Sequence, residues 1–214
     1  MIINNYQKKV WKGNFGEEFT KRNTFKSYDD WNNFYKIRYN LTKEEINKDF
    51  LGKLPKKIKI LEVGCNIGNQ LSCLYKMGFK NLYGIELQKE CLVIIKKKKK
   101  FLNVVNGSAD HLPFKNNSFD LVFTNNVLIH ISPIEIKNIV NEIYRTSSKW
   151  IWGFEYYSKN YEEIIYRNKK KLLWKANFSE IFKKKGRLKV LKEKLFQNIS
   201  SKNEIDKMYL LKKN

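Results

Sequence analysis

Residues 58–86 constrain the fold of this chain more than any other segment. A short apolar run at 58–63 is followed by a loop with glycines at positions 64 and 68, and 68–78 has the apolar spacing of a helix. A second apolar run, 81–86, ends in an acid. A strand, a glycine loop, a helix and a second strand in this order predict the parallel sheet of a doubly wound α/β fold.

The rest of the chain continues this alternation. The remaining elements are expected as strands at 102–106, 119–124 and 149–155, helices at 88–98, 133–146 and 174–185, and a final antiparallel hairpin of strands at 187–193 and 205–212. Residues 28–50 carry apolar side chains at mostly helical intervals, which predicts one or two helices packed on the sheet. We therefore expect a helical lid or extension over 1–52 and a cofactor-binding domain over 53–214, joined as one structural unit.

The formal net charge of +22 raises the question of a nucleic-acid partner, because clustered cations bind phosphates. Only five of the 43 basic residues are arginines, the side chains favoured for bidentate phosphate contacts. The chain is also rich in Lys, Asn and Ile, which A/T-rich codons encode, so composition accounts for much of the charge. The run Lys96–Lys100 falls at a predicted helix end, where cations suit the helix dipole. Nucleic acid is kept as the less favoured partner.

The three cysteines and two histidines lack the spacing of a metal site, and we expect no metal. An odd number of cysteines without a disulfide framework is typical of reduced thiols in a cytoplasmic protein. The sequence has neither a signal-peptide pattern nor an apolar stretch of membrane-spanning length, so we expect a cytoplasmic location.

The charge of the first loop indicates which ligand it binds. Glu62 stands where a dinucleotide-binding GxGxxG loop has its first glycine, and a carboxylate there repels a pyrophosphate. The same charge favours a cationic ligand such as the ammonium and sulfonium of S-adenosylmethionine. Glu86 follows Gly64 by 22 residues, the position from which an acid accepts hydrogen bonds from ribose hydroxyls. Together these residues predict an adenosyl ligand.

Two later segments complete the expected cofactor site. Residues 106–114 place a polar Ser108 and a small Ala109 after the third strand, suited to the adenine amino group and ring. His111 in the same segment is more simply explained as part of a turn. The strand at 119–124 delivers Asn125 and its neighbours to the same edge of the sheet.

The sequence resembles class I S-adenosylmethionine-dependent methyltransferases through LEVGCNIG, GIEL, GSADHLPF and FDLVFTNNVLIHI. More narrowly it is similar to pseudaminic acid biosynthesis-associated methylases, through WKGNFGEEFTKRN, VGCNIGN, VLIHISP and EYYSKNYEEIIYRN. The resemblance implies a mostly parallel, seven-stranded, Rossmann-like methyltransferase sheet and a sugar-related substrate. It departs from the broader superfamily at Asn66, where a glycine is usual, and at Ser108, where an acid is commoner.

The resemblance and the motifs together give the expected methyl-donor contacts. These are Glu62, Gly64, Cys65, Asn66, Gly68, Asn69, Glu86, Leu87, Ser108, Ala109, Asn125 and Val127. His130, just beyond the fourth strand, is the candidate catalytic base because histidine titrates near neutrality. Packing at the start of the next helix is its alternative role.

Two further groups are expected to close the acceptor pocket. The lid candidates are Trp11, Phe15, Phe19 and Arg22. The substrate candidates after the fifth strand are Glu155, Tyr156, Tyr157, Tyr166 and Arg167. The lid aromatics would attract a sulfonium, or would only anchor the N-terminal segment. Arg167 could bind the carboxylate of an acidic sugar, or could serve only as an ion-pair partner.

Three functions are compatible with these observations. The leading hypothesis is methylation of a small molecule, a nonulosonic-acid or nucleotide-linked sugar intermediate. The second is methylation of RNA or another nucleic acid. Against base amino methylation, residues 124–127 lack the Pro-Pro-aromatic sequence that stacks a flipped base. The third is a domain that binds the cofactor without catalysis, which the intact acids at 62 and 86 disfavour.

Overall fold

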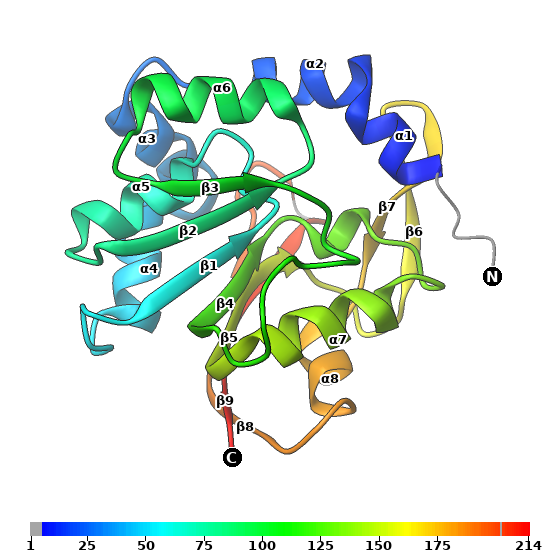
Figure 1. Ribbon diagram of the computed structural model, residues 1–214. Coiled ribbons are helices and arrows are strands. Elements are labelled where there is room, and N and C mark those ends of the chain that lie inside the picture. Colours follow the sequence, from blue (N-terminus) through cyan, green and yellow to red (C-terminus); the bar gives the residue numbers. More distant parts are fainter. Residues whose placement is uncertain (1–5, 202) are drawn as a thin grey trace.

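The computed structural model describes residues 6–201 and 203–214, which build a seven-stranded sheet covered by helices on both faces (Figure 1). The strands are β1 (Lys59–Val63), β2 (Asn81–Glu86), β3 (Asn103–Asn106), β4 (Phe119–Asn125), β5 (Ser147–Tyr156), β6 (Glu162–Tyr166), β7 (Lys169–Lys175), β8 (Leu188–Gln197) and β9 (Ile205–Lys213). The helices are α1 (Tyr6–Lys12), α2 (Asn14–Arg22), α3 (Tyr28–Tyr39), α4 (Lys43–Leu51), α5 (Asn69–Lys76), α6 (Lys89–Lys98), the 3₁₀ turn η1 (Leu128–His130), α7 (Ile136–Thr146) and α8 (Phe178–Lys183).

The strand order in the large sheet is β3-β2-β1-β4-β5-β9-β8. The first five strands run parallel, whereas β9 pairs with β5 and β8 in the antiparallel direction. The order reverses between β1 and β4, so the carboxyl ends of these strands flank the crevice where ligands bind in doubly wound sheets. The prediction of a mostly parallel, seven-stranded doubly wound fold is confirmed.

Both faces of the sheet are buried, as the continuous apolar runs in β1 and β4 require. One face packs against α3, α4, α5 and α6 through a core that includes Trp31, Phe50 and Leu71. The other face packs against α7, α8 and the β6–β7 hairpin through residues such as Ile143 and Phe178. Figure 1 shows α6 on one side of the sheet and α7 with α8 on the other.

One expected element differs in the structure. Residues 174–185 were predicted as a helix, but Lys169–Lys175 is strand β7, paired with β6, and only Phe178–Lys183 is helical. Arg167 and Asn168 both have positive φ, as a two-residue hairpin loop requires. An arginine is a weak signal for such a turn, which explains why the sequence did not reveal the hairpin.

Helices α3 and α4 begin at clear capping signals. Ser27 accepts a hydrogen bond from the Asp30 backbone N–H at 3.0 Å, and Thr42 with Glu45 forms a capping box. Helices α3 and α4 join the core of the sheet, whereas α1 and α2 lie over the carboxyl ends of its strands. The division at residue 52, just after α4, stays a prediction. In the part of the chain that the structure describes, no helix is long and apolar enough to cross a membrane.

Candidate active site

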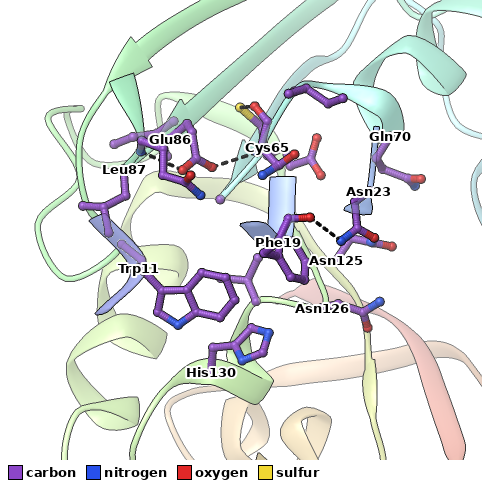
Figure 2. Close-up of a pocket in the computed structure, with 18 of the residues that line it drawn as sticks. Trp11, Phe19, Asn23, Cys65, Gln70, Glu86, Leu87, Asn125, Asn126 and His130 are labelled. Carbon is purple, nitrogen blue, oxygen red and sulfur yellow. Dashed lines mark hydrogen bonds between the residues drawn. The ribbon is translucent and has the colours of Figure 1, made fainter. Parts of the chain in front are cut away.

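A cavity of about 240 Å³ opens at the carboxyl ends of β1, β2 and β4 and is roofed by residues of α1 and α2. In the view of Figure 2, Glu86 and Leu87 lie at one end of the cavity and Gln70, Asn125 and Asn126 at the other. Eleven of the twelve expected donor residues line it; Gly68 does not. The motifs read from separate parts of the sequence therefore converge on one site.

The glycine loop has the backbone conformation that its sequence requires. Gly64 has a φ of 74°, and a Cβ there would lie 2.7 Å from a Val127 methyl group, so only glycine fits. Asn66 also has positive φ, 44°, a conformation that asparagine adopts more readily than most residues. Gly68 instead packs under the loop, where a Cβ would meet Leu102. The expected donor contact of Gly68 is therefore corrected, because its position beneath the loop keeps it out of the cavity lining.

Glu86 is held in place by the loop. Its carboxylate accepts hydrogen bonds from the backbone N–H of Asn66 at 2.7 Å and of Gln88 at 2.9 Å. Burial raises the pKa of Glu86, and the two N–H donors oppose that rise. Each carboxylate oxygen keeps a free lone pair, so the group can still accept bonds from ligand hydroxyls.

Glu62 is the second acid of the cavity, and one of its two carboxylate oxygens lacks a partner. The residue is 3% exposed, and its Oε2 atom is buried without a hydrogen bond among the described residues. Burial raises the pKa of Glu62 well above its usual value, while Lys43 and Lys99 act in the opposite direction. An unpaired buried carboxylate is costly, and a ligand cation would remove that cost.

Asn66 ties the loop to the helices above it. Its side-chain amide donates to the Thr20 hydroxyl on α2 at 2.7 Å, and Asn69 donates to the Asn23 carbonyl at 3.4 Å. Thr20 is also within 3.4 Å of the Gln88 side chain. The asparagine that departs from the usual glycine thus connects the glycine loop to α2.

The segment after β3 lines the cavity through Ser108, Ala109 and Asp110. Asp110 forms an ion pair with Lys8 of α1, which fixes that helix over this end of the site. His111 is exposed and lies outside the lining, in agreement with its interpretation as part of a turn.

Glu155 holds the loop after β4 in place through hydrogen bonds to its backbone. This carboxylate accepts the backbone N–H of Val127 at 3.2 Å and of Ile129 at 3.4 Å, and it is 1% exposed. Burial raises its pKa to about 7. The expected substrate contact of Glu155 is therefore corrected to a supporting role beneath the loop.

His130 lines the cavity in an aromatic setting. Its Nδ1 atom lies 2.8 Å from the Leu172 carbonyl oxygen, and since a carbonyl only accepts, Nδ1 carries the proton. The ring centroid lies 4.4 Å from that of Trp11 and 6.2 Å from that of Phe19. Burial lowers the pKa of His130 to about 4, so the near-neutral value expected for a histidine is corrected.

Only two of the lid and substrate candidates line the cavity. Trp11 and Phe19 line the cavity, whereas Phe15 packs on Trp11 and Tyr166 with centroid separations of 5.4 and 5.8 Å. Arg22 is exposed. The candidates outside the lining are Phe15, Arg22, Glu155, Tyr156, Tyr157, Tyr166 and Arg167.

Arg167 belongs to the exposed hairpin turn, with its guanidinium 6.0 Å from the Tyr166 ring centroid. The structure therefore removes Arg167 from the cavity, because the turn at β6–β7 carries it outward.

Several lining residues escaped the sequence analysis. The polar, charged and aromatic ones are Gln7, Lys8, Asn23, Phe25, Trp31, Phe34, Tyr35, Gln70, Gln88, Asp110, Asn126 and Glu135, and the others are Ile67, Ile85, Gly107, Ile131 and Ile139. Trp31 and Tyr35 were recognised as one helix face, but such spacing is typical of core residues as well. Gln70 directly follows the glycine loop, which is the one signal that could have identified it.

The cavity fits an adenosyl amino acid in charge and in polar groups. Glu62 offers a buried, unpaired carboxylate oxygen to an ammonium, Glu86 offers acceptors to ribose hydroxyls, and Ala109 contributes only a small side chain to the lining. Among the described residues, no group of histidines, cysteines or acids could hold a metal ion, and the three cysteines are buried and free.

Comparison with known proteins agrees with this geometry. Residues 61–149 match the sequence family described as a methyltransferase domain. An uncharacterised protein of Methanocaldococcus jannaschii is 32% identical over 121 residues, which are 55% of this chain and 46% of that protein. The chain thus spans about half the length of the curated relative it matches.

Two solved structures resemble nearly the whole chain. Magnesium protoporphyrin IX methyltransferase from Synechocystis, with bound S-adenosylhomocysteine, has a TM-score of 0.72 at 10% identity, covering 99% of this chain and 100% of that one. The 1,6-didemethyltoxoflavin N1-methyltransferase of Burkholderia thailandensis, also with S-adenosylhomocysteine, has a TM-score of 0.72 at 11% identity, covering 100% and 92%. At these identities the likeness establishes the fold alone.

Residues 61–149 thus match the methyltransferase-domain family, and the chain has the fold of S-adenosylmethionine-dependent methyltransferases. The buried acids of the cavity are the groups that the sequence predicted for S-adenosylmethionine.

Proposed function

We propose that this protein transfers the methyl group of S-adenosylmethionine to a small molecule bound in the same cavity. The observation that carries the proposal is Glu62, whose buried and unpaired Oε2 atom lies beside the glycine loop. In this role Glu62 holds the donor ammonium and Glu86 the ribose. The other expected donor contacts that line the cavity, from Gly64 to Val127 without Gly68, belong to the same proposal.

The protein's own contribution to the reaction is alignment. Methyl transfer from a sulfonium is an in-line displacement, and the donor supplies an electrophilic methyl group when bound. Holding the acceptor atom in line with that methyl group supplies most of the acceleration. Trp11 and Phe19 roof the cavity, exclude water and present aromatic faces to a cation.

His130 is proposed to take the acceptor proton. With Nδ1 bonded to the Leu172 carbonyl, Nε2 is the acceptor nitrogen of the ring. Its lowered pKa makes it a weak base, so it serves an acceptor whose proton becomes acidic as the new bond forms.

A small acceptor is favoured over nucleic acid by the roof. Lys8 of α1 pairs with Asp110, and Thr20 of α2 bonds to Asn66, so both helices are fixed across the mouth of the site. The finer expectation of a nonulosonic-acid or nucleotide-linked sugar stays a prediction based on resemblance to the pseudaminic acid-associated family, and the charges of the cavity lining give it no support.

The proposal is tested in two steps. Calorimetry should show binding of S-adenosylmethionine and S-adenosylhomocysteine to the purified protein. S-adenosylmethionine labelled in its methyl group should then transfer the label to a compound in a small-molecule extract and not to added RNA. Absence of donor binding would remove the proposed function, and label confined to RNA would replace its acceptor.

A further inference from the structure

The cavity extends beyond the groups assigned to the donor, towards α3. We call this part the acceptor end; it is lined by Phe25, Trp31, Phe34, Tyr35, Gln70 and Asn126. Four of these six side chains are aromatic, and none is charged. The acceptor end is therefore chemically distinct from the donor end, where Glu62 and Glu86 lie.

The aromatic residues form a connected wall. Ring centroids are 5.5 Å apart for Phe25 and Phe34, 5.4 Å for Phe34 and Tyr35, and 5.4 Å for Trp31 and Tyr35. Rings that support one another at these distances lose little freedom when a ligand packs on them. Such a wall favours a ligand with a flat apolar face.

The two amides offer hydrogen-bond acceptors. Gln70 is 3% exposed, and its NH₂ group donates to Asn47 at 3.1 Å, which leaves Oε1 buried and without a partner among the described residues. Asn126 Oδ1 is likewise buried and without a hydrogen-bond partner among the described residues. A carbonyl oxygen only accepts, so the ligand that satisfies these atoms brings an N–H or O–H group.

The charges of the lining are unfavourable for an anion. Within the described residues, Lys8 is the one cation that lines the cavity, and it is paired with Asp110. The unpaired charged groups of the lining are the carboxylates Glu62, Glu86 and Glu135. A buried ligand carboxylate or phosphate would lack a counter-charge here, and this costs several kcal/mol in general.

The buried Lys43 does not change this conclusion. Its ammonium is 4.7 Å from the Tyr35 ring centroid and 3.5 Å from that of Phe154, with no hydrogen-bond partner in the described chain. Lys43 is fully buried behind Tyr35 and does not line the cavity. It can therefore not contact an anionic acceptor.

We propose that the acceptor is an uncharged aromatic or heteroaromatic molecule that donates an N–H or O–H group to Gln70 or Asn126. The inference rests on the proposed function. In the reaction, a bond forms between the acceptor nitrogen or oxygen and the methyl carbon, and the carbon–sulfur bond breaks. The electron pair of that bond stays on sulfur, giving the neutral thioether, and the acceptor proton passes to His130 or to water.

The test compares probes that share a ring system and differ in charge. The protein is first saturated with S-adenosylhomocysteine. Calorimetry then measures the affinity of this complex for naphthol, hydroxynaphthoate, neutral N-acetylglucosamine and a nucleoside-diphosphate sugar. Naphthol is expected to bind about tenfold more tightly than each of the other three, because burial of an unpaired anion or of unsatisfied hydroxyls is penalised.

Matched variants locate the binding. Phe34→Leu should weaken naphthol binding about two- to tenfold, since it removes an aromatic contact at the partly exposed edge of the wall. Phe101→Leu is the control, because Phe101 is equally exposed but packs on Tyr75 away from the cavity. Gln70→Leu should weaken naphthol more than it weakens naphthalene, which has no O–H group.

The outcomes separate the two proposals. If S-adenosylhomocysteine fails to bind, the proposed function fails before any acceptor is examined. If it binds and naphthol shows no advantage over the other probes, the uncharged aromatic acceptor is overturned and the methyltransferase proposal stands.

Discussion

The two ends of the cavity are built in different ways. The donor end comes from the carboxyl ends of β1 and β2 and the loop after β1, where Glu62, Gly64 and Glu86 are fixed by backbone hydrogen bonds and by the sheet. The acceptor end comes mainly from the N-terminal helices, whose aromatic side chains pack on one another. The donor end is thus set by the main chain and by charge, the acceptor end by ring packing. Substitutions in α3 should therefore alter the acceptor end while the donor end remains intact.

Removal of the Glu62 charge should produce the largest effect on the donor end. Glu62→Gln keeps the shape of the side chain and is expected to weaken binding of S-adenosylmethionine about 10- to 100-fold, since a hydrogen bond to a charged group contributes about 1.5–3 kcal/mol. Calorimetry measures the change, with Glu90→Gln on the exposed face of α6 as the control. Folding should be preserved, because burial already favours the uncharged form of Glu62. Unchanged affinity would show that the donor cation lies elsewhere.

The same carboxylate should make donor binding depend on pH. Its pKa is raised by burial in the free protein, and the facing charges are Lys43 on α4, Lys99 after α6 and Glu86 on β2. A bound ammonium lowers that pKa, so binding releases a proton and affinity rises with pH, by at most about tenfold per unit. The rise ends once Glu62 is ionised in the free protein. Calorimetry in buffers of different ionisation enthalpy counts the released protons, and Glu62→Gln should abolish the release.

Loss of the hydrogen bond between the glycine loop and α2 should have a smaller effect on the donor. Thr20→Val removes the hydroxyl that accepts the Asn66 amide at 2.7 Å, and a lost hydrogen bond of this kind is worth about 1 kcal/mol. Release of S-adenosylhomocysteine should therefore be about fivefold faster, measured by stopped-flow fluorescence of Trp11 and its neighbours. Thr24→Val is the control, because Thr24 is exposed just after the same helix and its hydroxyl donates to the Thr20 carbonyl, not to the glycine loop. Equal release rates would mean that α2 does not restrain the donor.

The difference between the two ends also explains what the sequence could predict. Glu62, Gly64 and Glu86 lie within one short segment whose spacing reports the loop geometry directly, so the fold and the donor end were predictable. Trp31 has the helical spacing of a core residue, and only tertiary packing turns part of its surface towards the cavity. Gln70 carries no motif of its own. The β6–β7 hairpin was missed because its turn uses an arginine with positive φ.

The smallest effect is expected at that hairpin turn. Arg167 is exposed, lies outside the cavity lining and has a φ of 50°, a conformation that costs a non-glycine residue roughly 1–2 kcal/mol. Arg167→Gly should therefore stabilise the protein slightly, by at most about 1 kcal/mol after the entropy of glycine is counted. It should leave kcat/KM within about twofold, the scale of a surface substitution. Thermal unfolding and steady-state kinetics measure the two quantities on one sample. A tenfold loss of kcat/KM with an unchanged melting temperature would bring Arg167 back to the substrate and favour an acidic acceptor, because only a lost charge contact separates activity from stability in that way.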